Sequence, residues 1–310
     1  MYEGLSSPTI YNVKTLTEYA SAIQSHPDAI IWAGGSFILT RPDAYPSRVN
    51  NQDIIYLGDM EELKRTQRND RLLEYGAMVS LDNILNFNKS GLPHLLEDNI
   101  TEIGSSMVTS RATIGGAICT QGLVTSIPGT LIALGANIEI RYAKKKRMHS
   151  RWLPLARALD KNGKISLPPR SLLTRVRVAL NNPDIQRYFT IGSLMKEPKH
   201  AVVVAFASDW NQDILVNPHL VITCPLLGIC YSRDIDTIFS SLRFPLDNEE
   251  YSSLETIVFT FIDATFSSIT DLQRARIKGI LEDIVNDLNN KTLTISQDLA
   301  LEQSSFRKGL

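Results

Sequence analysis

The sequence predicts an α+β fold divided into two domains. Short apolar runs typical of strands alternate with segments whose apolar residues recur at helical spacing, which favours an α+β or an α/β fold. A length of 310 residues suits two domains or one large one. Asn181 to Asp184 reads Asn-Asn-Pro-Asp, the strongest boundary signal in the chain. We therefore expect domains at residues 1–180 and 181–290, followed by a polar tail at 291–310.

Composition excludes several classes of protein. The net charge is −1, so nothing indicates a nucleic-acid-binding surface. Hydrophobic residues make up 43% and charged residues 21%, which is ordinary for a globular chain with a sizeable core. The first residues lack a basic segment followed by an apolar one, and no apolar run reaches the length that spans a membrane. We expect a cytoplasmic protein without a membrane anchor.

The cysteines and histidines do not predict a metal site. The cysteines are Cys119, Cys224 and Cys230, and none belongs to a C-x-x-C pair, so neither a disulfide framework nor a zinc ribbon is expected. An all-cysteine iron–sulfur cluster needs four thiolates. The five histidines are dispersed, and we interpret them as surface or hydrogen-bonded residues. The G-x-S-x-G, P-loop and G-x-G-x-x-G motifs are all missing from the sequence.

The first quarter of the chain predicts a helix between strands. Thr15 and Glu18 form a capping-box pattern before apolar residues at helical spacing up to Ile23. The apolar run 29–32 predicts a strand that enters a Gly-Gly pair, and 54–56 predicts another strand, followed by a turn or short helix at 60–63.

The rest of the first domain alternates in the same way. We expect a strand at 72–75, a helix from Ser80 to Phe87 and helical structure over 92–108. Further predictions are a strand at 137–142, a hairpin turn at the basic run 144–147, a helical turn at 152–159 and a closing strand at 176–180.

Buried strands and one amphipathic helix characterise the second domain. The apolar runs 201–207 and 220–230 predict buried segments, the second broken at Pro225, with its two cysteines in the core. Thr270 and Gln273 form another capping-box pattern. An apolar stripe follows at helical spacing and predicts a helix packed on a sheet; its members are Ile277, Ile280, Leu281, Ile284, Val285 and Leu288. From Asn289 onward the chain is polar, and we expect it to be loose.

Two Gly-Gly pairs are the candidate functional feature. Gly34-Gly35 follows a predicted strand, and Gly115-Gly116 lies in the segment Arg111 to Ala136. Glycine lets the backbone approach a ligand closely, and consecutive N–H groups in such a turn can bind phosphate. Each pair alone is also compatible with a tight turn. Together, two loops from separate strands could hold one diphosphate. A Rossmann site is excluded, because prolines rather than a helix follow the first pair.

Five segments of the chain match, in order, the motifs of one known family. Ala33 to Ser36 fits the pattern A-G-G-[TS], and Leu73 to Ile84 fits L-x-I-G-A-M-V-[ST]-L-x-x-I. Thr113 to Ile118 fits T-I-G-G-x-I, and Leu131 to Ala136 fits L-x-A-L-G-A. Leu167 to Thr174 fits L-x-P-x-x-L-[IL]-T. Over about residues 10–290 the chain thus resembles the FAD-binding medium subunit of the molybdenum hydroxylases, of the xanthine dehydrogenase and carbon monoxide dehydrogenase types.

The resemblance implies a two-lobed FAD-binding domain of the vanillyl-alcohol-oxidase (PCMH) type and a smaller α+β C-terminal domain. It implies non-covalent FAD whose diphosphate is held by backbone N–H groups of both glycine loops. The FAD-dependent oxidoreductase subunit would receive electrons from an iron–sulfur subunit, beside a molybdopterin subunit, and pass a hydride to NAD+. The cofactor-binding residues implied are Trp32, Ala33, Gly34, Gly35, Ser36, Phe37, Thr113, Ile114, Gly115, Gly116, Ala117, Thr120 and Ser126.

Several positions depart from the family pattern. Ala117 stands where the family has Asn, Ser126 where it has Asp, and Phe37 where it has a polar residue. Fewer side-chain hydrogen bonds to the ribityl and adenosine parts predict weaker FAD binding. A second hypothesis is therefore a flavin-poor scaffold or assembly subunit of the same fold. A third, a self-contained flavin oxidase or reductase, stays open because Cys119 is close to the second loop.

Overall fold

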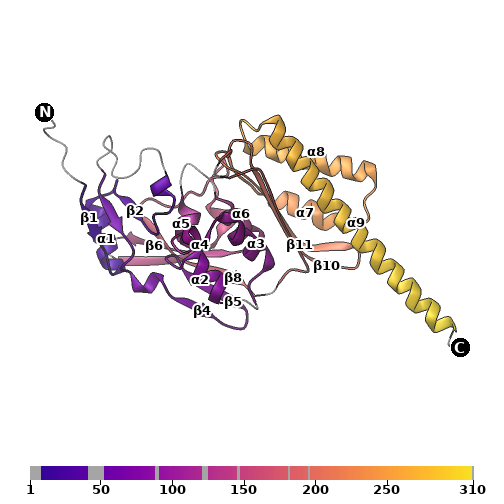
Figure 1. Cartoon of the computed structure of the whole chain (residues 1–310), viewed down its shortest axis with the longest axis horizontal. Helices are drawn as coiled ribbons and strands as arrows, with labels where there is room; N and C mark the ends of the chain where they lie inside the picture. The colour runs from indigo at the N-terminus through magenta and orange to yellow at the C-terminus, as the bar shows by residue number, and fades with distance from the viewer. Residues whose placement is uncertain are drawn as a thin grey trace. The chain divides into compact units, whose positions relative to one another are not determined.

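The structure is a computed structural model of the 310-residue chain (Figure 1). It describes residues 8–40, 52–87, 91–120, 125–144, 147–180, 182–194 and 196–308, with the backbone alone at 40, 143–144, 147 and 293–308. The chain forms two compact units, one of residues 1–160 and 165–182, the other of 161–164 and 183–310. Helices and sheets both contribute to each unit, which confirms the predicted α+β class.

A small parallel sheet forms the first lobe of unit one. Its strand order is β1 (Ile10–Asn12), β3 (Ile54–Tyr56), β2 (Ile30–Trp32). Helix α1 (Leu16–Ser25) begins where predicted, because the Thr15 side chain accepts a hydrogen bond from the Glu18 N–H at 3.2 Å. Tyr19 and Ile23 are buried in a cluster that includes residues of β3, so the helix covers the sheet.

A larger antiparallel sheet forms the second lobe. Its order is β4 (Thr66–Arg68), β5 (Leu72–Gly76), β8 (Ser171–Ala179), β6 (Asn137–Lys144), β7 (Arg147–Pro154). The Tyr19 hydroxyl donates to the Ser171 carbonyl oxygen at 3.1 Å, which ties the two lobes together. The helices of this lobe are α2 (Leu81–Phe87), α3 (His94–Ile103), α4 (Ser106–Thr109), α5 (Ile114–Cys119) and α6 (Ser126–Ala133).

The described residues of unit two form a four-stranded antiparallel sheet and three helices. The strand order is β12 (Gly228–Cys230), β11 (Ile214–Cys224), β10 (Val202–Asn211), β9 (Ile185–Ile191). The helices are α7 (Arg233–Ser241), α8 (Asn248–Thr265) and α9 (Asp271–Lys308). The Thr270 and Gln273 side chains make both bonds of the predicted capping box, at 3.2 and 3.1 Å.

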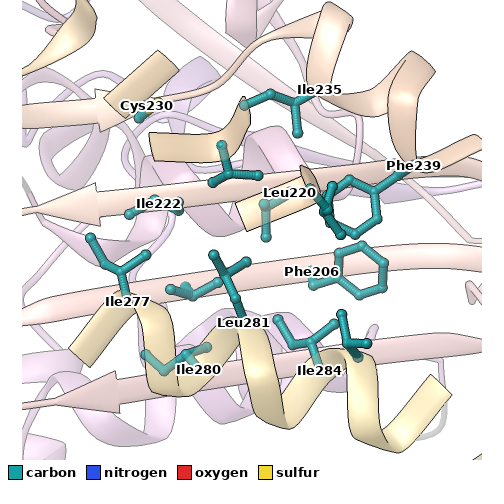
Figure 2. Close-up of a cluster of buried hydrophobic side chains, with 14 of the residues drawn as sticks. Phe206, Leu220, Ile222, Cys230, Ile235, Phe239, Ile277, Ile280, Leu281 and Ile284 are labelled. Atoms are coloured by element: carbon teal, nitrogen blue, oxygen red, sulfur yellow. The ribbon is translucent and has the colours of Figure 1, made fainter. Parts of the chain in front are cut away.

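The predicted apolar stripe of α9 is buried against this sheet. Figure 2 shows Ile277, Leu281 and Ile284 of α9 directed at the strands that carry Phe206, Leu220 and Ile222. All six predicted stripe residues are at most 3% exposed. Cys224 and Cys230 are buried too, and burial raises the pKa of the Cys230 thiol to about 11. The prediction that these two cysteines are core residues is confirmed.

Some sequence expectations are wrong. Residues 152–154 belong to β7 rather than to a helical turn, because Trp152 pairs with Glu139 of β6, and a single 3₁₀ turn follows at Leu155–Ala158. The segment 291–308 continues α9 rather than being loose, since it contains neither proline nor glycine before Gly309. Positions 145–146 of the expected basic turn lie outside the described residues.

Other elements went unpredicted. Helices α7 and α8 are among them, although Asp247 and Glu250 make a complete capping box at the start of α8 that the sequence already displays. Residues 161–164, expected in the first domain, group with unit two. The reason is local, because the Ile229 N–H donates to the Gly163 carbonyl at 2.8 Å.

One charged network spans three strands of the larger sheet. Glu139 of β6 lies opposite Arg175 of β8, with 3.3 Å between the Glu139 carboxylate and the Arg175 Nε, and it accepts from the Thr174 hydroxyl at 2.6 Å. Glu74 of β5 pairs with Arg175 at 2.8 Å. Burial raises the pKa of Glu139, but the Thr174 hydrogen bond and the charges of Arg141 and Arg175 outweigh it, so the pKa is lowered.

The Glu139 network makes stability depend on pH. A carboxyl whose pKa is lowered on folding contributes stability that is present above its unfolded value, 4.5, and lost as the pH falls through the folded value. We expect Glu139→Gln to be less stable than the wild type at pH 7, with a difference that shrinks steadily below pH about 4.5. Urea unfolding at several pH values measures this. The exposed Glu61→Gln is the control, and a difference independent of pH would contradict the account.

Candidate flavin site

The first glycine loop begins where β2 ends. The Trp32 carbonyl accepts from the Leu57 N–H at 2.9 Å, and the chain then turns through Ala33 to Phe37 into a single 3₁₀ turn at Ile38–Thr40. Gly35 has a φ of +71°, and a Cβ built there would lie 2.7 Å from the Trp32 indole nitrogen. Only glycine fits this position, because both the backbone angle and the indole exclude a side chain.

Consecutive N–H groups of this loop have no acceptor among the described residues. Among the residues that the structure describes, none accepts a hydrogen bond from the N–H groups of Gly34, Gly35 or Ser36. Successive N–H groups around a left-handed residue form a concave, partly positive surface that suits an anion. The first loop therefore has the donors that a phosphate needs.

The second loop is built differently. Thr113 caps α5, since its hydroxyl oxygen accepts from the Gly116 N–H at 3.1 Å. The N–H groups of Ile114 and Gly115 donate to the carbonyls of Val79 and Ala77, at 3.0 and 2.9 Å. The Ala117 N–H donates to the Thr113 carbonyl at 2.8 Å. The N–H groups expected to be free are thus hydrogen-bonded inside the chain. This loop can therefore offer a ligand close approach at its glycines, but not those N–H donors.

The two loops lie against each other. A Cβ built on Gly34 would be 1.7 Å from the Arg111 carbonyl oxygen, and one built on Gly116 would be 3.8 Å from the Ala33 Cβ. Gly34 is therefore a glycine because the backbone before the second loop occupies the space of a side chain. Gly115 is a glycine for a similar reason, because its Cβ would lie 2.7 Å from that of Ala77.

The remaining predicted residues follow α5. Thr120 donates its hydroxyl to the Gly116 carbonyl at 2.7 Å, and Thr125 donates to the Ala117 carbonyl at 2.9 Å, which brings the start of α6 beside α5. Ser126, the first residue of α6, is 1% exposed, and its hydroxyl has no partner among the described residues. Thr130, one turn further along α6, is also buried, and its hydroxyl likewise has no partner among the described residues.

A buried hydroxyl without a partner costs about 1–3 kcal/mol, so both hydroxyls need a water or ligand group. Ser126 was among the residues predicted from the sequence, whereas Thr130 was not. The i, i+4 spacing of two polar residues in an apolar helix was the available signal.

No group of three or more His, Cys, Asp or Glu residues among the described positions could hold a metal ion. None of the helices in the described ranges is both long and apolar enough to cross a membrane.

Comparison with protein families decides the identity of the first unit. Residues 5–180 match the family model described as the FAD binding domain in molybdopterin dehydrogenase. The chain belongs to this family. It is an FAD-binding subunit of the molybdenum hydroxylase family, and FAD is its cofactor. Among curated proteins, none matches the chain.

Solved structures show the same fold over nearly the whole chain. Quinoline 2-oxidoreductase from Pseudomonas putida 86 superposes with a TM-score of 0.71 at 16% identity, covering 93% of this chain and 99% of that one. Carbon monoxide dehydrogenase from Hydrogenophaga pseudoflava gives 0.71 at 16% identity, covering 94% and 99%. A Cu,Mo carbon monoxide dehydrogenase gives 0.69 at 15%, covering 92% and 96%. The two-lobed FAD-binding fold and the α+β unit that follows are those expected.

The described residues fit FAD at two points. The free N–H groups of Gly34 to Ser36 fit the diphosphate. The unpaired hydroxyl of Ser126 fits a polar group of the rest of the cofactor. The second loop fits less completely than expected, since its N–H groups are already bonded.

The packing of Gly34 against Arg111 gives a direct test. We expect Gly34→Ala to lower the free energy of unfolding by about 1–3 kcal/mol, because the new Cβ must push the two loops apart. Gly279→Ala is the matched control. A Cβ there meets nothing within 4 Å, and the helix gains up to about 1 kcal/mol. Chemical unfolding of both variants measures the two effects. A Gly34→Ala variant as stable as the wild type would contradict this packing.

Proposed function

We propose that this chain is the electron-transfer subunit of a molybdenum-hydroxylase-type oxidoreductase and binds FAD non-covalently with the two glycine loops. The observation that carries the proposal is the run of unpaired N–H groups at Gly34, Gly35 and Ser36, held beside the second loop. A diphosphate is an anion that needs such donors in a partly water-excluded place.

Six of the predicted residues then have a definite role. Gly34, Gly35 and Ser36 donate to the diphosphate, while Gly116 lets the cofactor approach the second loop closely. Thr113 keeps that loop rigid through its cap on Gly116. Ser126 supplies its free hydroxyl to the ribityl chain or the ring. The supporting fact for this last role is the burial of a hydroxyl that has no described partner.

The proposed partners are those that the family resemblance implies. An iron–sulfur subunit would deliver electrons and a molybdopterin subunit would oxidise the substrate, since three cysteines cannot provide an all-cysteine iron–sulfur cluster in this chain. The similarity to a Cu,Mo carbon monoxide dehydrogenase supports such a complex. Bound FAD supplies a carrier that takes up two electrons and two protons and releases a hydride and a proton. We propose NAD+ as acceptor, as in xanthine dehydrogenases, and a cytoplasmic location.

A second candidate function has its own support. The N–H groups of Ile114 to Ala117 are all engaged within the chain, and Ala117 and Ser126 replace the amide and carboxylate of the family pattern. Weak retention of FAD would suit a scaffold or assembly subunit of the same fold. The two functions differ in whether the purified chain holds flavin.

Cofactor content separates the two candidates. We expect the purified full-length chain to show the visible absorption of oxidised flavin, to release FAD rather than FMN on heating, and to lose its colour when NADH is added without oxygen. Gly116→Val should retain no flavin, because its side chain would meet Thr113 Oγ1, 2.9 Å from the Cβ position, and cover the approach.

A colourless chain that takes up no added FAD would refute the proposal and favour the scaffold. If the chain binds FAD but NADH does not reduce it, only the proposal that NAD+ is the acceptor is refuted.

A further inference from the structure

Arg111 lies at the contact between the two glycine loops. Its carbonyl oxygen is the atom that a Cβ on Gly34 would strike, at 1.7 Å. Its side chain is exposed to solvent, two residues before the Thr113 cap of α5. The backbone of Arg111 is therefore fixed beside the unpaired N–H groups of the first loop, while its long side chain can turn toward a ligand bound there.

No other charged residue is available in either loop segment. Residues 29–40 contain no Asp, Glu, Lys or Arg, and between Ile103 and Ile138 Arg111 is the only one. Backbone N–H groups offer partial charges, whereas a diphosphate ester carries about two full negative charges at neutral pH. Of these two segments, only Arg111 can supply a full positive charge to the diphosphate.

The Arg111 guanidinium is not used elsewhere in the fold. It makes no hydrogen bond or ion pair with any residue that the structure describes. Two arginines of β8, by contrast, are engaged, since Arg175 lies 2.8 Å and Arg177 2.6 Å from the Glu74 carboxylate. Binding of an anion by Arg111 therefore requires no existing interaction of the guanidinium to be broken.

We propose that Arg111 binds the diphosphate of the cofactor through its guanidinium and makes the site select phosphate-bearing flavins. The inference rests on the proposed function, since it assumes that FAD occupies the two loops. Guanidinium and phosphate form paired, charge-assisted hydrogen bonds, which are stronger than bonds between neutral groups. The N–H groups of Gly34 to Ser36 position the diphosphate, and Arg111 neutralises it.

Binding measurements on the full chain test this proposal. The ligands are FAD, ADP, which carries the diphosphate without the flavin, and riboflavin, which carries the flavin without phosphate. We expect Arg111→Met to bind FAD and ADP about tenfold more weakly and riboflavin as well as the wild type does. Affinity for FAD should fall with added salt in the wild type, and less steeply in the variant. Arg111→Lys should restore the salt dependence.

Arg71→Met is the matched control. Arg71 is also exposed, lies in the turn before β5, and makes no described side-chain contact, so its loss should change none of these affinities. If the wild type and Arg111→Met bind FAD with the same affinity and the same salt dependence, the proposed role of Arg111 is refuted. The proposal that FAD occupies the two loops is then unaffected. If riboflavin weakens as much as FAD, the substitution acts on the loop rather than on charge, which also refutes it. A wild type that binds no FAD overturns both proposals.

Discussion

The close packing of Gly34 on the Arg111 carbonyl is the constraint on which the candidate site depends. This contact has no room for a side chain, since a Cβ would lie 1.7 Å from the oxygen. It joins a loop of the small parallel lobe to a segment of the antiparallel lobe, residues far apart in sequence. Because it fixes one backbone against the other, the unpaired N–H groups of Gly34 to Ser36 remain next to the second loop.

Different constraints require glycine at the positions of the two Gly-Gly pairs. Gly35 needs its positive φ, whereas Gly34 and Gly115 are limited by neighbouring backbone and by Ala77. One loop leaves its donors free and the other uses them to fasten α5 to the chain at Val79 and Ala77. In the proposed site the first loop would donate hydrogen bonds to the ligand, and the second would only lie against it, so the two loops would not form a symmetric clamp.

Local patterns predicted much of the fold, because caps and apolar periodicity are decided within a few residues. The Thr270–Gln273 box and the α9 stripe were found in this way. The end of strand β7, residues 152–154, was assigned to a helical turn because its strand conformation depends on pairing with Glu139 and its neighbours in β6. The engagement of the Ile114 and Gly115 N–H groups could not be foreseen either, since their acceptors are the carbonyls of Val79 and Ala77. The charge of Arg111 was visible in the sequence, but its position beside Gly34 was not.

Hydrogen–deuterium exchange, resolved by residue with and without FAD, tests the central claim most directly. The N–H groups of Gly34, Gly35 and Ser36 should exchange quickly in the free chain, because they lack acceptors, and slowly once FAD is bound. Those of Ile114 to Ala117 should be protected in both states. If FAD binds and leaves the exchange of Gly34 to Ser36 unchanged, the first loop does not hold the diphosphate and the account is wrong.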